Sequence, residues 1–264
     1  MRGEIKMALL ETQKLSINFG GLWAVKDVDF AIDSGEVVGL IGPNGSGKTT
    51  FLNIISGIYQ ATRGKAFLKN EDITGLKPYQ IYQKGISRTY QSSRLCWDLS
   101  VADNIAIGLY AKQTSSLFDV VFRPGKCNEE IHQGVQQAMD MLCYFNPDLV
   151  DKRYELTKNI PHIDRRRIEI SRALVGSPSI LLLDEPTAGL NEEETMTMMR
   201  DIEKIKEKIS DICIIIIEHD MQVMKEVPER IVVFNAGEKI AEGVYDQVVN
   251  DPSVISAYLG GAEK

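Results

Sequence analysis

The chain has 264 residues, of which 44% are hydrophobic and 25% are charged, and its formal net charge is -7 at pH 7. This length allows one large α/β domain, or a core with a small inserted lobe. The acidic balance argues against a nucleic-acid-binding surface as the main function, although it leaves room for a local basic patch.

Three features concern the membrane and the compartment. The longest uninterrupted apolar run, Ile212–Ile217, is far shorter than the ~20 residues that span a bilayer. The stretch Met1–Lys6 has no signal-peptide apolar core, and the cysteines form no C-x-x-C pair. We therefore expect a protein of the cytoplasm with reduced cysteines, whose membrane role, if it has one, depends on a partner.

Apolar runs predict a series of strands. The early ones lie close together along the chain with no long crossover, so we expect an antiparallel sheet among them. The last three are nearly all apolar and alternate with helix-length segments, which is typical of a parallel sheet covered on both faces. The predicted strands are Leu15–Phe19, Val25–Ile32, Val37–Ile41, Lys65–Leu68, Ile180–Leu183, Ile212–Ile217 and Ile231–Phe234.

Helical patterns separate these runs. Between about residues 91 and 160 the pattern is mainly helical, with loops around Gln113–Ser116 and Arg123–Cys127. We interpret this stretch as an inserted helical lobe within a single domain that spans residues 1–264. The predicted helices are Thr49–Ser56, Val101–Tyr110, Glu129–Phe145, Arg165–Leu174, Glu192–Ile209 and Met221–Val227.

The stretch Gly42–Thr49 matches the phosphate-loop pattern G-x-x-x-x-G-K-[ST] without a mismatch. It lies between a predicted strand and a predicted helix, and this context distinguishes a phosphate site from a chance glycine-rich loop. The glycines let backbone N–H groups converge on phosphate oxygens, and the helix N-terminus adds a partial positive charge. Lys48 is expected to neutralise the β- and γ-phosphates, and the Thr49 hydroxyl to ligate Mg²⁺. The predicted nucleotide-binding residues here are Gly42, Pro43, Asn44, Gly45, Ser46, Gly47, Lys48, Thr49 and Thr50.

Two carboxylates, Asp184 and Glu185, end the hydrophobic run Ile180–Leu183. In a P-loop protein an Asp at this place organises the metal ion, so we expect Asp184 to hold Mg²⁺ directly or through water. Glu185 points to a different side and is placed to polarise the attacking water as a general base. The alternative is an acidic strand end that simply faces solvent.

Two other polar residues are candidates for the site. His219 comes after Ile214–Ile217, and beside a phosphate loop and an acidic strand end the favoured interpretation is a contact with the γ-phosphate. A structural histidine is the alternative. Gln91 follows Ile86–Tyr90, and on its own it is equally well explained as a loop anchor.

The order of these motifs resembles that of the ATPase subunits of ABC transporters. The phosphate loop, Gln91, the pair Asp184–Glu185, the segment Ala188–Asn191 and His219 occur in the order seen in that family, and the likeness covers essentially the whole chain. Other segments are similar to the ATP-binding subunits of branched-chain amino acid importers. These are Phe19–Leu22, Ser87–Gln91, Ile217–Met221, Gly237–Gly243, Asp251–Pro252 and Ala257–Gly260.

The resemblance implies a fold and a set of ligands. The fold is an α/β P-loop ABC ATPase with a mixed central sheet, an antiparallel β-lobe and a helical lobe. The ligands are ATP and Mg²⁺. The implied catalytic residues are Glu185, His219 and Lys48, and the implied metal residues are Thr49, Gln91 and Asp184.

The resemblance also implies contacts outside the phosphate site. Phe19 would stack on adenine, and a core position in the first strand is the alternative. The helical lobe would dock on membrane-spanning permease subunits. Leu95, Trp97 and Leu99 belong either to that contact or to the interior of the lobe.

The chain departs from the family at the signature motif. In the family this motif is typically Leu-Ser-Gly-Gly-Gln at a helix start, and it clamps the nucleotide held by the phosphate loop of a second subunit. Here Ile160–Asp164 takes its place. Pro161 removes a hydroxyl and a backbone N–H, and Ile163 puts a β-branched side chain where the backbone should approach the γ-phosphate. Asp164 is expected to bring negative charge towards that phosphate.

The helix that follows can still form. Pro161 suits a first helical turn, and Asp164 is favourable at a helix N-terminus. We interpret the run Arg165–Arg167 as a solvated helix face. The chain would thus supply a working phosphate loop and Glu185 to one composite site and a poor signature to the other. A heterodimer with a signature-bearing ATPase would then be asymmetric, whereas a homodimer would have two impaired sites.

The leading function is an ATP-binding and hydrolysing subunit that energises an importer of branched-chain or related amino acids. It would lie peripherally on the cytoplasmic face of the inner membrane, with permease subunits and a second ATPase subunit or a second copy as partners, and without nucleic acid. One alternative is a regulatory, low-turnover ATP-binding subunit of such a complex. A less favoured alternative is a soluble ABC protein that acts on ribosomes or DNA. Such proteins usually carry two nucleotide domains or a long coiled-coil insertion, and this sequence shows neither.

Overall fold

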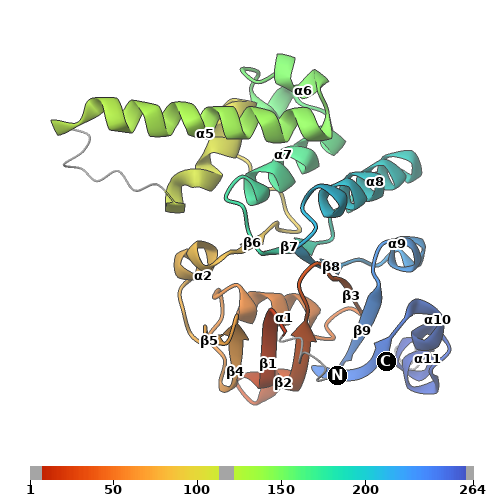
Figure 1. The fold of residues 1–264 in the computed structure, drawn as a ribbon. Helices are drawn as coiled ribbons and strands as arrows, with labels where there is room; N and C mark the ends of the chain where they lie inside the picture. The colour runs from red at the N-terminus through yellow and green to blue at the C-terminus, as the bar shows by residue number, and fades with distance from the viewer. Residues whose placement is uncertain (1–7, 113–121, 260–264) are drawn as a thin grey trace, which may run out of the picture.

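The computed structural model describes residues 8–112 and 122–259, which form two β-sheets with a layer of helices above them (Figure 1). The larger sheet crosses the middle of the view, and the smaller one lies below it. This arrangement is the α/β fold expected from the sequence. The predicted loop around Gln113–Ser116 lies largely outside the described residues. The upper layer contains α5 (Pro124–Phe145), α6 (Asp148–Asp151) and α7 (His162–Leu174).

The larger sheet has the strand order β10-β9-β3-β8-β7-β6. Neighbouring strands are parallel except β9 and β10. Every residue of β3, β7 and β8 is buried, which explains their nearly continuous apolar sequences. Because these three strands are parallel, their carboxyl ends meet at one edge of the sheet. The strands are β3 (Val37–Ile41), β6 (Ile86–Arg88), β7 (Ile180–Asp184), β8 (Cys213–Ile217), β9 (Arg230–Asn235) and β10 (Glu238–Gly243).

The smaller sheet has the order β2-β1-β4-β5, and all of its pairs are antiparallel. The turn between its first two strands contains Gly20 and Gly21, both with positive φ, a conformation that glycine adopts without strain. The antiparallel sheet expected among the early strands is therefore confirmed. Its strands are β1 (Leu10–Phe19), β2 (Leu22–Ile32), β4 (Arg63–Leu68) and β5 (Glu71–Asp72).

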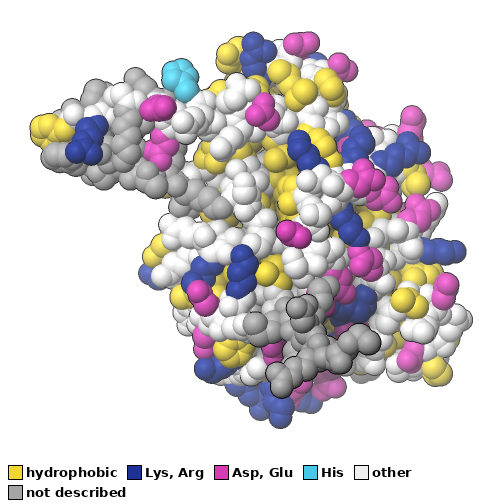
Figure 2. Space-filling view, in the orientation of Figure 1, with side chains coloured by type: hydrophobic (Ala, Val, Ile, Leu, Met, Phe, Trp, Pro, Cys, Tyr) yellow, Lys and Arg dark blue, Asp and Glu magenta, His cyan; other side chains and the backbone are white. Residues whose placement is uncertain are grey.

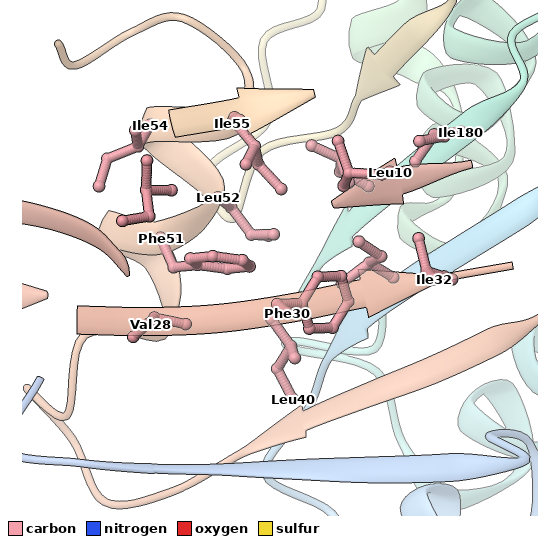
Figure 3. Packing of buried hydrophobic residues seen from close by; sticks show 14 of the residues in the cluster. Leu10, Val28, Phe30, Ile32, Leu40, Phe51, Leu52, Ile54, Ile55 and Ile180 are labelled. Carbon is pink, nitrogen blue, oxygen red and sulfur yellow. The ribbon is translucent and has the colours of Figure 1, made fainter. Parts of the chain in front are cut away.

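The main core lies around helix α1 (Lys48–Ile55), between the two sheets. Figure 3 shows Phe51 and Leu52 of α1 pointing toward Phe30 of β2. The rings of Phe30 and Phe51 are 5.4 Å apart in an edge-to-face arrangement, and Phe51 is fully buried. Truncating such a side chain to Ala costs about 3–5 kcal/mol of stability. The packing therefore fixes α1, and with it the loop from which α1 starts.

The upper helical layer has a core of its own, which includes Val101, Ile105 and Leu142. Leu95 belongs to this core and is 5% exposed, so it is an interior residue, whereas Trp97 and Leu99 are exposed. The limits of an inserted lobe at about residues 91–160 stay a prediction. None of the helices formed by the described residues combines the length and the apolar character needed to cross a bilayer.

Several helix limits differ from the sequence-based expectation. Helix α5 begins at Pro124, so the predicted loop at Arg123–Cys127 is wrong; proline is compatible with the first helical position and does not mark a loop there. The predicted helix Val101–Tyr110 is an α-helix followed by a 3₁₀ segment. The remaining helices are α2 (Pro78–Lys84), α3 (Val101–Ala106), η1 (Ile107–Lys112), η2 (Thr157–Asn159), α8 (Glu192–Lys208), α9 (Met221–Glu226), α10 (Tyr245–Val249) and α11 (Pro252–Leu259).

Candidate functional site

The phosphate loop joins β3 to α1 at the carboxyl edge of the larger sheet. Gly42 has φ +143, and a Cβ there would lie 2.0 Å from the carbonyl oxygen of Phe234. Gly47 has φ +107, and a Cβ there would lie 2.4 Å from the carbonyl oxygen of Ala24. Only glycine fits both positions. Helix α1 begins without a side-chain cap and with no acidic residue in its first turn, so its first N–H groups have no side-chain acceptor.

Lys48 folds back over this loop. Its Nζ donates to the carbonyl oxygens of Gly42 at 2.7 Å and Pro43 at 3.0 Å. Burial lowers the pKa of Lys48, while the negative charges of Glu185 and Asp184 act in the opposite direction. Because burial penalises the cation, an anionic group beside Nζ would relieve that penalty.

One cavity, of about 140 Å³, brings the phosphate loop together with Glu185 and His219. The Nε2 atom of His219 lies 2.9 Å from Oε1 of Glu185, and Nε2 of Gln91 donates to Oε2 at 2.8 Å. Glu185 has φ +51, a conformation that costs a non-glycine residue about 1–3 kcal/mol. Its side chain is only 16% exposed, so an acidic strand end that simply faces solvent does not describe it.

A second cavity, of about 270 Å³, is lined by Thr49, Gln91 and Asp184 together. Oδ2 of Asp184 accepts a hydrogen bond from Arg88 at 2.7 Å. Oδ1 of Asp184 is buried and has no hydrogen-bond partner among the described residues, which is costly unless a cation or water satisfies it. A hydroxyl, an amide oxygen and a carboxylate are ligands that Mg²⁺ prefers. The residues present therefore fit a magnesium ion.

Comparison with known proteins decides the family. The protein-family model described as ABC transporter matches residues 25–188. The chain belongs to the ABC transporter family. A second model, described as branched-chain amino acid ATP-binding cassette transporter, matches residues 238–264. Since the cassettes of this family hydrolyse ATP, the chain is an ABC ATPase and its ligand is a nucleotide.

The ABC ATPase has relatives over nearly its whole length. The high-affinity branched-chain amino acid transport ATP-binding protein LivG of Escherichia coli is 35% identical over 254 residues, which cover 96% of this chain and 98% of LivG. BraF of Pseudomonas aeruginosa, described in the same words, is 34% identical with the same coverage. A probable LivG of Archaeoglobus fulgidus is 33% identical over 258 residues, 97% of each chain.

Solved structures agree with this assignment. An ATP-binding cassette of an ABC transporter in its ADP conformation has a TM-score of 0.82 and 29% identity, and covers 96% of this chain and 99% of its own. A nucleotide-free cassette has a TM-score of 0.82 and 28% identity with the same coverage. The predicted family and fold class are confirmed.

Phe19 of the ABC ATPase lies where β1 ends. It is 47% exposed, and its ring meets that of Tyr59 edge-on at 5.4 Å. The alternative that Phe19 is a core residue is therefore wrong. Phe19 lines neither cavity, and its stacking on adenine stays a prediction.

The helix after the signature position, α7, begins at His162 with Pro161 before it, and no side chain caps it. Asp164 lies in its first turn and is 8% exposed. Its Oδ1 accepts from Nη1 of Arg167 at 2.9 Å and from Nδ2 of Asn146 at 3.2 Å. The expectation that Asp164 directs negative charge towards a nucleotide is thus wrong, because the carboxylate is turned inward and paired.

The run Arg165–Arg167 is not a solvated helix face. Arg166 is buried, and its Nη2 donates to the carbonyl oxygens of Gln91 at 3.1 Å and Ala188 at 3.3 Å. Nε of Arg167 donates to Oδ2 of Asp201 in α8 at 2.8 Å. The run therefore ties α7 to the segment around Gln91 and to α8.

Sequence reasoning gave no role to Arg88 or Glu218. Arg88 is the last residue of a three-residue strand, and Glu218 directly follows a run of isoleucines. A charged residue next to buried strand residues is usually itself buried and paired. The backbone N–H and Oγ1 of Thr187 donate to Oε1 of Glu218 at 2.8 and 2.6 Å. Burial raises the pKa of Glu218.

Proposed function

We propose that the chain is the subunit that binds and hydrolyses MgATP to energise an importer of branched-chain or related amino acids. The observation that carries this proposal is the convergence of the phosphate loop, Glu185 and His219 on one cavity, beside a second cavity with Thr49, Gln91 and Asp184. Neither set is contiguous in sequence, so the fold assembles both.

The chain's own groups have distinct roles in this proposal. Backbone N–H groups of the loop and Nζ of Lys48 bind the β- and γ-phosphates. Glu185 acts as the general base for the attacking water. His219 and Gln91 each contact one of its carboxylate oxygens and thereby orient the side chain. His219, 47% exposed in its side chain, would exchange its contact with Glu185 for one with the γ-phosphate when the nucleotide binds. Thr49, Gln91 and Asp184 would hold Mg²⁺, which would supply positive charge to the phosphate oxygens.

The amino acid substrate is proposed from the relatives. LivG and BraF are named as branched-chain amino acid transport proteins, and the family model that matches residues 238–264 carries the same substrate in its description. An ATPase subunit does not bind the transported molecule itself, so the likeness supports the class of importer rather than one amino acid.

Permease subunits are the proposed membrane partners, with the chain peripheral on the cytoplasmic face. A groove of about 630 Å³, here called the α2–η1 groove, includes Tyr79, Tyr82, Arg94, Ile107 and Tyr110 in its lining. Tyr110 is 78% exposed and Tyr79 54%, and exposed aromatic and arginine side chains are enriched at protein interfaces. Hydrophobic side chains are also exposed among the upper helices, as Figure 2 shows. A permease segment seated in this groove would lie next to the metal cavity, because Arg88, Tyr90 and Arg94 line both.

A second ATPase subunit with an intact signature is the proposed partner across the nucleotide. Pro161 offers no N–H and Ile163 carries a branched side chain where a phosphate clamp needs close backbone approach. A heterodimer would then have one efficient site, at this chain's phosphate loop, and one slow or structural site. The second candidate function is a regulatory subunit with little turnover. The altered signature motif favours it, and the placement of Glu185 argues against it.

Reconstitution of the chain with the permease and ATPase subunits that neighbouring genes encode tests the proposal. We expect ATP-dependent uptake of labelled leucine, and a loss of about 10²–10³-fold in turnover for Glu185→Gln with ATP binding retained. Turnover that is unchanged in Glu185→Gln would contradict the assigned base. Uptake of leucine that is independent of ATP would contradict the importer.

A further inference from the structure

Arg88 forms a buried ion pair with the proposed metal carboxylate. Its Nη2 lies 2.7 Å from Oδ2 of Asp184, and the two side chains are 5% and 2% exposed. The contact is single rather than bidentate, because Nε of Arg88 and Oδ1 of Asp184 both lack a hydrogen-bond partner among the described residues. The arginine thus occupies one carboxylate oxygen and leaves the other buried and without a hydrogen-bond partner among the described residues, while Asp184 itself lines the cavity with Thr49 and Gln91.

The other end of the guanidinium reaches α1. Nη1 of Arg88 donates to Oδ1 of Asn53 at 2.6 Å and to Oγ of Ser56 at 3.1 Å. Asn53 lies one helical turn after Thr49 on this helix. One side chain therefore fixes the helix that carries Thr49 relative to the strand that carries Asp184.

Arg88 also connects to the third proposed ligand. It ends β6, and Gln91 follows three residues later. Its guanidinium lies over the ring of Tyr90, 5.3 Å from the ring centre. The elements that carry Thr49, Gln91 and Asp184 thus meet at this single buried cation.

We propose that Arg88 is a positioning residue for the metal site: it holds Asp184 with one oxygen turned to the metal and keeps Thr49 and Gln91 in register with it. This inference rests on the proposed MgATP function. A buried arginine that served only to join β6, β7 and α1 would stabilise the fold without affecting metal affinity. Hydrogen-bond partners of metal ligands, by contrast, typically contribute about 10–100-fold to metal affinity.

The test measures metal binding rather than turnover. The full chain is saturated with the non-hydrolysable nucleotide AMP-PNP, and Mn²⁺ is titrated with electron paramagnetic resonance as the readout. We expect Arg88→Met to raise the Mn²⁺ dissociation constant about tenfold. The affinity for AMP-PNP in EDTA should change by less than about threefold, because Arg88 lines the metal cavity and not the phosphate cavity.

Two variants serve as controls. Arg153→Met removes a cation that lines neither the phosphate cavity nor the metal cavity, so its Mn²⁺ affinity should equal that of the wild type. In an Asp184→Asn background, Arg88→Met should lower Mn²⁺ affinity by a smaller factor than in the wild type, since the contact with the Asp184 carboxylate is already lost.

A second variant keeps the inference testable if Arg88→Met does not fold. Arg88→Lys retains the charge but not the fork that joins Asp184 to Asn53, and we expect an intermediate loss of about threefold in Mn²⁺ affinity. Wild-type Mn²⁺ affinity in Arg88→Lys, or in a folded Arg88→Met of lowered thermal stability, would overturn the inference. If the wild type itself shows no Mn²⁺ binding with AMP-PNP, the proposed function fails instead.

Discussion

Helices α1 and α7 begin in opposite ways. Helix α1 follows Gly47 and has no acidic residue in its first turn. Helix α7 follows Pro161 and carries Asp164 in its first turn. Both helices have the same partial positive charge at the N-terminus, so the residues around that end decide what it binds.

The difference shows that a helix dipole is not sufficient for a phosphate site. At α1 the glycines let an anion approach the backbone, and Lys48 adds a charge. At α7 the chain's own carboxylate already lies in the first turn and is paired with Arg167. The start of α7 is thus stable without an external anion, whereas the start of α1 is arranged to receive one.

Gly47→Ala should remove the capacity of the α1 start to bind an anion. The Cβ would lie 2.4 Å from the carbonyl oxygen of Ala24 at a φ of +107, so we expect a loss of about 1–3 kcal/mol in the free energy of unfolding. Losing two charge-assisted hydrogen bonds to phosphate should weaken ATP binding about 100-fold. Calorimetric titration and urea unfolding measure the two effects. The matched change at α7, Ile163→Ala, should leave ATP affinity within about twofold; wild-type binding by Gly47→Ala would refute the comparison.

The double change Pro161→Ser and Ile163→Gly tests the start of α7. Restoring a hydroxyl, an N–H and close backbone approach should raise ATP turnover of the isolated chain at least about tenfold. Phosphate release at saturating ATP and high protein concentration is the measurement. The same pair in a Glu185→Gln background should show no increase. If the unmodified chain alone turns over ATP as fast as the double variant, the proposed heterodimer with one efficient and one slow site is wrong.

Glu218→Gln should have the smallest effect. Burial raises the pKa of Glu218 above 4.5, so the stability it contributes is fully present below pH 4.5 and is lost as the pH rises through the folded-state pKa. Gln keeps an acceptor for Thr187 and removes the charge. We expect the unfolding free energy of Glu218→Gln to decline less steeply than that of the wild type as the pH rises above 4.5, with a gain below about 1 kcal/mol where the wild-type carboxylate is charged.

The exposed Glu193 of α8 provides the control for that series. Glu193→Gln should change the unfolding free energy by less than about 0.5 kcal/mol, as is usual for exposed substitutions. A slope in Glu218→Gln that equals the wild-type slope would show that Glu218 does not titrate in this range.

Local patterns predicted the strand and the helix on either side of the proposed phosphate loop. The loop Gly42–Thr49 and the pair Asp184–Glu185 are contiguous, and burial on both faces makes the parallel strands continuously apolar. Strand β6, in contrast, has only three residues, too few for a periodic signal. The loop predicted at Arg123–Cys127 is wrong for a different reason: Pro124 begins α5, and proline is over-represented at the first helical position.

The signature half could not be read in the same way. A row of arginines on a helix looks identical whether it faces water or a packed neighbour. Only the tertiary fold supplies Asp201 of α8 as the partner of Arg167 and the carbonyl oxygens around Gln91 as partners of Arg166. Likewise, the sequence alone suggests that Asp164 faces a nucleotide. The structure shows that its carboxylate is paired with Asn146 and Arg167 instead.

The position of β3 in the sheet has a consequence for biosynthesis. Its two neighbours are β8 and β9, which lie between Cys213 and Asn235. The strand that carries the phosphate loop thus leaves the ribosome long before either strand that supports it, and closing such long loops is slow. The antiparallel sheet and the helical layer are complete earlier in the chain. The nucleotide site therefore forms only after β8 and β9 have been synthesised.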